Sequence, residues 1–271
     1  MIRVGKRVFA FAVLSVALTA CETVQTTQGG AVDVDRKQYM AVSSKELDEA
    51  ASKQYAELIA QAKQKNLLNR NPAQLARVKT IANRLIAQTP VFRPDARDWK
   101  WEVNVLTSDE VNAWCMPGGK IAVYTGLLDK LQLTDDELAA VLGHEISHAL
   151  REHARERVSE QAVAGGLISL GSSLFGIGDL GQQGLQYAYM GAIGLPHSRG
   201  QETEADRMGV ELAARAGYDP RAAQTLWQKM AKQGGSEPPA FLSTHPSSEA
   251  RQQDLGAVAQ RVMPLYQQAQ R

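Results

Sequence analysis

The sequence His144-Glu145-Ile146-Ser147-His148 constrains the fold more than any other part of this 271-residue chain. Two histidines four positions apart lie on one face of an α-helix, about one turn from each other. Both imidazoles can then bind a single Zn²⁺, and the glutamate beside them can take a proton from an attacking water. The pattern therefore predicts a metal-binding helix, provided that its flanks are helical and that a third ligand exists.

The residues around the motif predict the helix that it needs. Thr134 and Glu137 have the spacing of a capping box, and the two aspartates between them suit the positive end of a helix. Apolar residues then recur at helical spacing: Leu138, Val141, Leu142, Ile146, Ala149 and Leu150. The motif thus falls within an amphipathic helix, where two histidines and a glutamate would be costly to bury unpaired.

A catalytic zinc usually has three protein ligands, so a third ligand is expected elsewhere in the chain. A metzincin would place it at position 154, which is Ala154, and that interpretation fails. His153 lies about 140° around an ideal helix from His148, and we expect it to face solvent.

Glu202 and Asp206 are the better candidates, because they share one face of a second predicted helix that ends near Gly217. Glu202 can bind the metal while Asp206 accepts the free N–H of a ligand histidine. Glu204 points about 160° away from Asp206, and we expect it to be solvated. A charged helix start explains the same residues, so their spacing alone leaves the ligand open.

Other segments predict a small sheet among helices. We expect helices over 44–65 and after Pro72, and extended segments over 99–105, 111–116 and 120–125. Together with the motif helix they indicate an α+β fold that is mostly helical.

Three motifs in order resemble the HtpX/CAAX-prenyl-protease (Ste-type) family of gluzincin metallopeptidases. They are HEISHAL at 144–150, SRGQETEADRMG at 198–209 and STHP at 243–246. The likeness covers about residues 73–251 and is nearest to the soluble periplasmic members of that family. It implies a zincin-like domain with one Zn²⁺ per chain, held by His144, His148 and Glu202.

The segment 112–119, NAWCMPGG, is similar to a stretch that leads, in that family, into the strand bordering the substrate cleft. We expect an extended peptide to pair with this backbone. The residues of the expected substrate strand are Asn112, Ala113, Trp114, Cys115 and Met116. No motif pairs Cys115 with a base, so we do not assign it as a nucleophile.

Two residues are candidates for the group that stabilises a developing oxyanion. His245 is the first and Arg251 the second. His245 can instead act as a fourth metal ligand that closes the resting site, and the sequence leaves both roles open.

Residues 1–20 have the form of a bacterial lipoprotein signal peptide. A basic start precedes the apolar run 8–20, which is shorter than the roughly 20 residues that span a bilayer. The lipobox-like sequence LTAC ends at Cys21, which we expect to be diacylated and to anchor the chain to a membrane. Glu22, by resemblance to the usual sorting rule, favours the periplasmic face of the outer membrane.

The remaining composition predicts a flexible tether over 21–43 and one metallopeptidase domain over 44–271. Within that domain the glycine-rich segment 165–194 is expected to be lid-like. Lys and Arg total 30 against 29 Asp and Glu, without a basic block, which argues against a nucleic-acid partner.

The resemblance implies a zinc-dependent endopeptidase that cleaves unfolded or misassembled envelope proteins, with envelope-assembly machinery as a possible partner. One alternative is a chaperone or assembly factor whose peptidase site is normally closed. Another is a non-catalytic zinc scaffold, which the presence of Glu145 disfavours, because a structural site needs no base.

Overall fold

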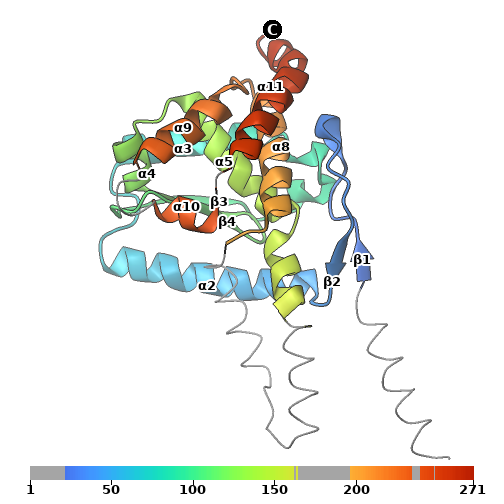
Figure 1. Cartoon of the computed structure of the whole chain (residues 1–271). Coiled ribbons are helices and arrows are strands. Elements are labelled where there is room, and N and C mark those ends of the chain that lie inside the picture. The colour runs from blue at the N-terminus through green and yellow to red at the C-terminus, as the bar shows by residue number, and fades with distance from the viewer. Residues whose placement is uncertain (1–21, 162, 164–195, 234–238, 247) are drawn as a thin grey trace, which may run out of the picture.

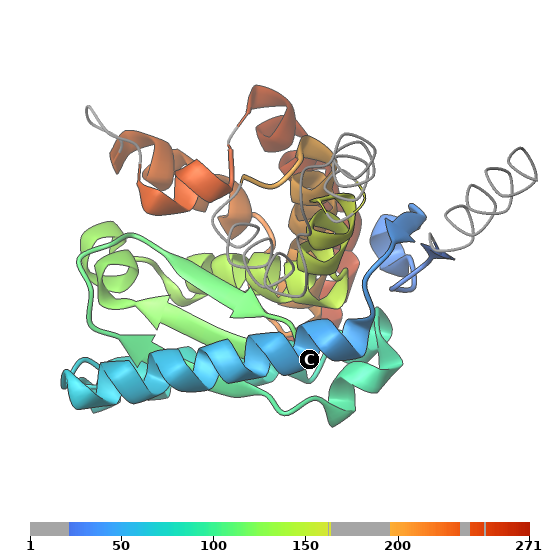
Figure 2. The same cartoon turned by 90° about the horizontal axis from the view of Figure 1, so that it is seen from below.

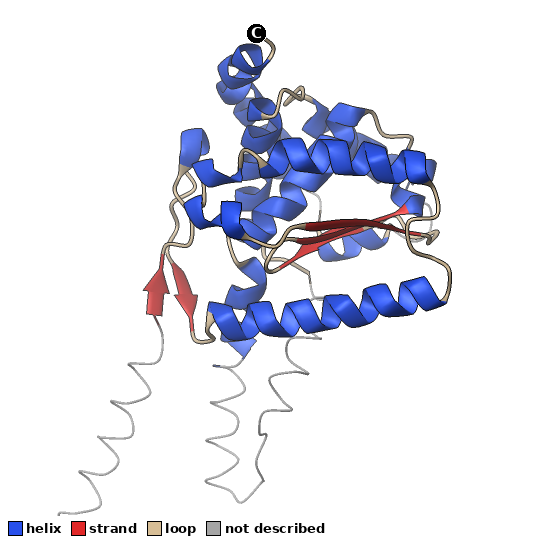
Figure 3. Cartoon of the chain, turned by 180° about the vertical axis from the view of Figure 1, so that it is seen from behind, coloured by secondary structure: helices blue, strands red, loops and turns tan. Residues whose placement is uncertain are grey.

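The computed structural model describes residues 22–161, 163, 196–233, 239–246 and 248–271. The predicted signal peptide with Cys21 and the glycine-rich segment 165–194 lie outside the described residues. The described part is mostly helical and contains a small three-stranded sheet between helices (Figure 3). This architecture confirms the predicted α+β, zincin-like fold class.

The sheet contains β3 (Glu102–Leu106), β5 (Lys120–Tyr124) and β4 (Ala113–Met116), in that order across the sheet. β5 pairs in parallel with β3 and antiparallel with β4, so β4 is an edge strand. Gly118 and Gly119, at φ values of +75° and +80°, form the turn between β4 and β5, a conformation that glycine adopts without strain.

Helices cover both faces of this sheet. α2 (Ser44–Gln64) lies across one face (Figure 2), while α3 (Pro72–Ile86) and α5 (Asp135–Leu150) lie on the other (Figure 1). Side chains alternate between the two faces, as the pleat of a strand requires. Ile121 of β5 belongs to the main core, whereas its neighbour Ala122 packs in the cluster that contains residues of α2.

Side-chain caps account for the helix starts that the sequence predicts. Ser43 caps α2 and Asn71 caps α3. Thr134 and Glu137 form the predicted capping box at the start of α5, with both of its hydrogen bonds in place. The HExxH motif therefore lies within α5, as predicted.

A second capping box, formed by Ser198 and Gln201, starts α8 (Arg199–Arg215). α8 crosses α5 at two glycines, Gly143 and Gly209. A Cβ on Gly143 would lie 2.7 Å from the carbonyl oxygen of Gly209, which shows how closely the two backbones approach. The crossing places the predicted ligand helix directly beside the motif.

Further helices are α4 (Thr125–Leu131), α9 (Ala222–Gln233), α10 (Ala240–Thr244) and α11 (Glu249–Ala269), with short 3₁₀ segments η2 (Thr89–Val91) and η3 (Pro94–Asp98). Residues 153–161 are also helical. α11 packs against α8 and α9. Among the described residues, none of the helices has both the length and the apolar character needed to cross a membrane.

Residues 22–42, here called the N-terminal strap, pack on the domain. They contain β1 (Glu22–Val24), η1 (Gly30–Val32) and β2 (Gln38–Met40), and β1 pairs antiparallel with β2. Val32 and Val34 are buried in the main core. This packing differs from the flexible tether that the sequence predicts over 21–43.

The reason for the difference is that polar strap residues find buried partners. Gln38 is fully buried and donates from Nε2 to the carbonyl oxygen of Arg151 at 2.8 Å and to Glu156 at 3.0 Å. The backbone N–H of Ala31 donates to Glu211 Oε2 at 2.8 Å. A segment rich in Thr, Gln and Asp has no local apolar pattern, so its docking depends on partners far away in the sequence.

We predict that Gly209→Ala destabilises the protein. The added Cβ would lie 2.7 Å from the backbone nitrogen of His144 and 2.8 Å from the carbonyl carbon of Gly143, which can move only if the helices separate. Overpacking of this kind costs about 1–3 kcal/mol. Thermal unfolding of the metal-free protein should show a lower Tm.

Gly200→Ala on the same helix is the matched control. Its Cβ would meet only Ser198 Oγ, at 3.9 Å, so the Tm should stay the same or rise with the better helix propensity of alanine. Equal Tm values for the two variants would contradict the close crossing.

Candidate active site

Three elements bring the predicted site residues together. α5 supplies His144, Glu145 and His148, α8 supplies Glu202, and His245 follows directly after α10. All five side chains are buried, Glu202 most completely at 1% exposure. The site therefore forms inside the domain, at the crossing of α5 and α8.

The ligand atoms converge on one point. The Nε2 atoms of His144 and His148 are 3.0 Å apart, and oxygens of Glu202 lie 3.6 Å and 3.4 Å from them. One ligand atom from each of these residues and from His245 lies within 4.8 Å of all the others. Two imidazole nitrogens and a carboxylate oxygen are the donor set of a catalytic zinc site.

The protonation states of His148 and Glu202 also suit the binding of a metal cation. Burial lowers the pKa of His148 well below its usual value, which keeps the imidazole neutral and able to bind metal. Burial alone would raise the pKa of Glu202, but a hydrogen bond with His245 and the nearby His144 bring it down to about 2. Glu202 is therefore an ionised carboxylate beside the neutral imidazole of His148. Burial alone would lower the pKa of His144, but its hydrogen bond with Asp206 and the nearby Glu202 raise it.

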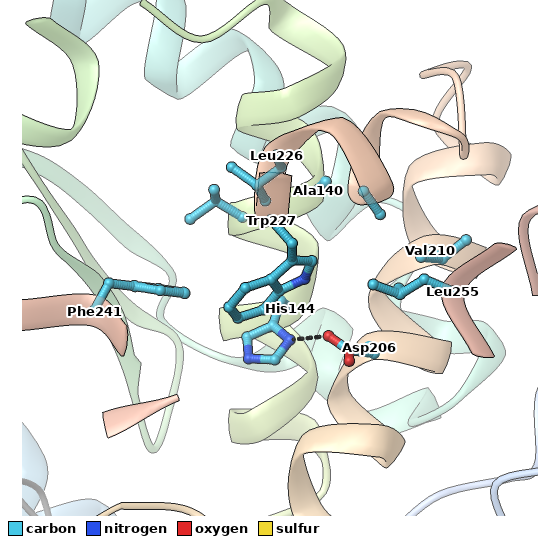
Figure 4. Close-up of a pocket in the computed structure, with 10 residues that line it drawn as sticks. Ala140, His144, Asp206, Val210, Leu226, Trp227, Phe241 and Leu255 are labelled. Atoms are coloured by element: carbon cyan, nitrogen blue, oxygen red, sulfur yellow. Dashed lines mark hydrogen bonds and ion pairs between the residues drawn. The ribbon is translucent and has the colours of Figure 1, made fainter. Parts of the chain in front are cut away.

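Asp206 contacts the ring nitrogen of His144 that faces away from the ligand cluster. Asp206 Oδ1 lies 2.9 Å from His144 Nδ1, and Figure 4 shows the imidazole pointing at this carboxylate. A proton on Nδ1 leaves Nε2 free for the metal, so Asp206 occupies the position predicted for the partner of a ligand histidine.

Arg251 lies behind the carboxylates of the site. Its Nε and Nη2 donate to Asp206 at 2.7 Å and 2.8 Å, and its Nη1 is 2.7 Å from Glu202 Oε2. The guanidinium stacks on Trp227 at 4.2 Å. With its donors engaged in this way, Arg251 orients two carboxylates and does not face the cleft, which disfavours it as an oxyanion donor.

Glu145 and Glu202 each have a buried carboxylate oxygen without a hydrogen bond among the described residues, but that of Glu202 is ion-paired with Arg251. Glu145 Oε1 is buried and has no hydrogen-bond partner in the described part of the chain, and His245 Nε2 lies 3.4 Å away. Burial raises the pKa of Glu145, which increases its affinity for a proton. A buried carboxylate oxygen left open in this way is suited to accept a proton from a bound water.

A cavity of about 280 Å³ lies in front of Glu145 and His148. The predicted substrate strand forms one wall, since Asn112 and all four residues of β4 line it, and His245 lies on another side. Burial raises the pKa of Cys115 well above its usual value, so its sulfur is a thiol and a poor nucleophile.

Sequence reasoning misplaced His153 and Glu204, which were expected in solvent and are buried. His153 Nδ1 lies 2.8 Å from His148 Nδ1, and Glu204 lies against His153. The helical-wheel argument failed because α5 ends at Leu150 and Glu152 adopts φ +52°, so His153 starts a new helical segment that is out of register with α5. The chain has only five histidines, and all five lie in or beside this site. The small number of histidines is the signal in the composition that could have pointed to a shared site.

Arg157 and His197 are further residues that the motifs did not assign to the site. Both line the cavity, and the His197 ring lies 3.9 Å from that of His148. Arg157 contacts His197 through Nη1, while burial lowers the pKa of its guanidinium to about 10. Arg157 thus places a cation at the cavity, near enough to Glu145 for its charge to oppose the effect of burial on the pKa of that carboxyl.

We predict that Glu202→Ala weakens zinc binding by far more than tenfold, because it removes a ligand and not an outer partner, whose loss alone costs about 10- to 100-fold. Competition with a chelator at pH 7 measures this. Thr203→Ala, one position along α8 and pointing away from the cluster, is the control and should bind zinc like wild type. Undiminished zinc in Glu202→Ala would remove the residue from the ligand set.

Comparison with known proteins gives the family. The model of peptidase family M48 matches residues 72–259. The chain is 33% identical over 219 residues to "Mitochondrial metalloendopeptidase OMA1" of Schizosaccharomyces pombe, covering 80% of this chain and 62% of that protein. It is 34% identical over 215 residues to "Metalloendopeptidase OMA1, mitochondrial" of Bos taurus, covering 74% and 40%.

A bacterial relative is similar over a shorter stretch. "Beta-barrel assembly-enhancing protease" of Escherichia coli is 30% identical over 176 residues, 61% of this chain and 36% of that protein. The chain thus spans between about a third and two thirds of the length of these relatives. The family match covers well over half of the chain and contains the HExxH helix, Glu202 and His245, and we conclude that the chain belongs to peptidase family M48.

Proposed function

We propose that this protein is a zinc-dependent endopeptidase. The observation that carries the proposal is the open, buried carboxylate of Glu145 beside the converging ligand atoms of His144, His148 and Glu202. A structural zinc site would need the ligands but not the base. The non-catalytic scaffold therefore fits this arrangement less well.

Zn²⁺ bound by these three residues would polarise the scissile carbonyl and lower the pKa of the attacking water to about 7. Glu145 takes the proton of that water and returns it to the leaving amine. Its raised pKa, caused by burial, brings it closer to the operating pH, where a general base is most effective. Asp206 and Arg251 hold the ligands in place during this exchange.

The substrate is proposed to be an extended polypeptide that adds a strand to the sheet. β4 pairs with β5 on one side only, and its residues line the cavity in front of Glu145. Backbone pairing at a strand edge recognises main chain and not particular side chains. It therefore suits unfolded or misassembled proteins, whose backbone is accessible.

A second candidate function is a peptidase whose site is normally closed, as in a chaperone or assembly factor. The position of His245 favours it, because its Nδ1 lies 3.2 Å from His144 Nε2 and 3.0 Å from Glu202 Oε1, within reach of the same metal. A fourth protein ligand would fill the position that a catalytic zinc leaves open.

His245→Ala separates the two roles that remain for this residue. Faster cleavage with weaker zinc binding would identify a closing fourth ligand. Slower cleavage with unchanged zinc binding would identify a donor to the oxyanion. Unchanged cleavage and zinc binding together would contradict both roles.

We further propose a lipid-anchored location at the periplasmic face of the bacterial outer membrane, similar to members such as LoiP and BepA, with envelope-assembly machinery as partner. Support comes from the lipobox-like sequence at Cys21 and from the bacterial relative, which is named a β-barrel assembly-enhancing protease. The mitochondrial relatives show that the family serves more than one compartment. β1 begins at Glu22, so an anchor at Cys21 would attach without a spacer.

We predict that Glu145→Gln abolishes cleavage of an unfolded protein such as casein while zinc content stays at one ion per chain. Loss of a general base typically costs about 10²- to 10⁴-fold in rate, and the amide cannot accept the proton. Glu49→Gln, at an exposed position of α2, should cleave like wild type. Full activity in Glu145→Gln would exclude this mechanism.

A further inference from the structure

His148 meets another histidine on the side that faces away from the ligand cluster. Its Nε2 points to His144 Nε2 at 3.0 Å, and its Nδ1 lies 2.8 Å from His153 Nδ1. His153 Nε2 in turn lies 3.0 Å from Glu204 Oε2. His153 is fully buried and Glu204 is 8% exposed, so water does not compete for these contacts.

Only one arrangement of protons satisfies this chain of contacts when His148 binds a metal through Nε2. His148 must then carry its proton on Nδ1 and donate it to His153 Nδ1. His153 must accept there with a lone pair, so its own proton lies on Nε2 and is donated to the Glu204 carboxylate. Both hydrogen bonds are thus made by neutral imidazoles, and the carboxylate is ionised.

We propose that His153 and Glu204 are positioning residues that fix the tautomer and the ring orientation of His148. The proposal rests on the proposed function in one respect, namely that His148 is a metal ligand. His144 is held by a carboxylate directly, through Asp206, whereas His148 is held by a carboxylate through an intervening imidazole.

The geometry of α8 explains why the intervening histidine is needed. Glu202 and Asp206 are four residues apart and share the face of α8 that meets the ligand cluster, while Glu204 leaves the helix on another side. That side faces the turn after α5, where Arg151 and His153 lie. The imidazole of His153 spans the space between Glu204 and His148, so neither of these residues needs to move to make the contact.

Glu204 is itself fixed by two arginines. Arg36 of the N-terminal strap donates from Nε to Glu204 Oε1 at 2.6 Å, and Arg151 donates from Nε to Oε2 at 3.1 Å. Arg36 also pairs with Glu156 at 2.6 Å. The strap therefore orients the carboxylate that ends the chain of contacts to His148, and its docking supports the metal site.

The test is the zinc affinity of the purified full chain, measured by chelator competition, together with the visible absorption spectrum of the Co²⁺-loaded protein. His153→Leu should weaken zinc binding about 10- to 100-fold, as expected when the outer partner of a ligand histidine is lost. The Co²⁺ bands should shift, because the His148 ring is no longer held at one angle.

His153→Gln is the conservative variant. Its amide oxygen can accept from His148 Nδ1 and its NH₂ group can donate to Glu204, so zinc affinity and the Co²⁺ spectrum should return most of the way to wild type. Val78→Ala is the control for stability, since it shortens a fully buried core side chain of α3 that belongs neither to the ligand cluster nor to the strap. It should lower the Tm while zinc affinity stays within about threefold of wild type.

Three results would overturn the proposal. One is wild-type zinc affinity in a folded His153→Leu, and another is an equal loss in His153→Gln and His153→Leu. The third is a second zinc ion per chain that is lost in His153→Leu, because His148, His153 and His197 also lie close enough to bind a metal themselves. Failure of the proposed function can be distinguished from failure of this positioning role. In that case the wild-type protein would bind no zinc, or Glu145→Gln would stay active.

Discussion

The close crossing of α5 and α8 is the constraint on which the rest of the structure depends. Each helix alone supplies an incomplete ligand set, two histidines from α5 and one carboxylate from α8. Only glycines at 143 and 209 allow the backbones to come near enough for these atoms to converge. α3 and β4 pack against α5, α11 packs against α8, and β4 lines the cavity in front of Glu145.

The crossing buries many charged groups, and their pairing follows one pattern. The ligand carboxylate of Glu202 and the supporting carboxylates of Asp206 and Glu204 are all paired with arginine: Arg251 with Glu202 and Asp206, and Arg36 and Arg151 with Glu204. Removing one member of a buried pair leaves an uncompensated charge, which is far more costly than the pair itself. The network therefore holds the ligand geometry with little freedom, as a metal site with an open position requires.

Structural features that depend on short sequence spacings could be predicted, whereas features that depend on contacts between distant residues could not. The capping box at Thr134, the motif helix and the face shared by Glu202 and Asp206 follow from short spacings, and the structure has them. The burial of His153 depends on the left-handed Glu152, and that of Glu204 on Arg36, 168 residues away. No periodicity encodes such partners, and the same holds for the docked strap.

The most direct measurement of the central claim is the anomalous scattering of a crystal of the zinc-loaded protein, recorded at the zinc absorption edge. We expect one peak per chain, about 2.0–2.2 Å from Nε2 of His144, Nε2 of His148 and a carboxylate oxygen of Glu202, beside the open carboxylate of Glu145. A peak held by other residues, or no ordered zinc at the crossing of α5 and α8, would contradict it.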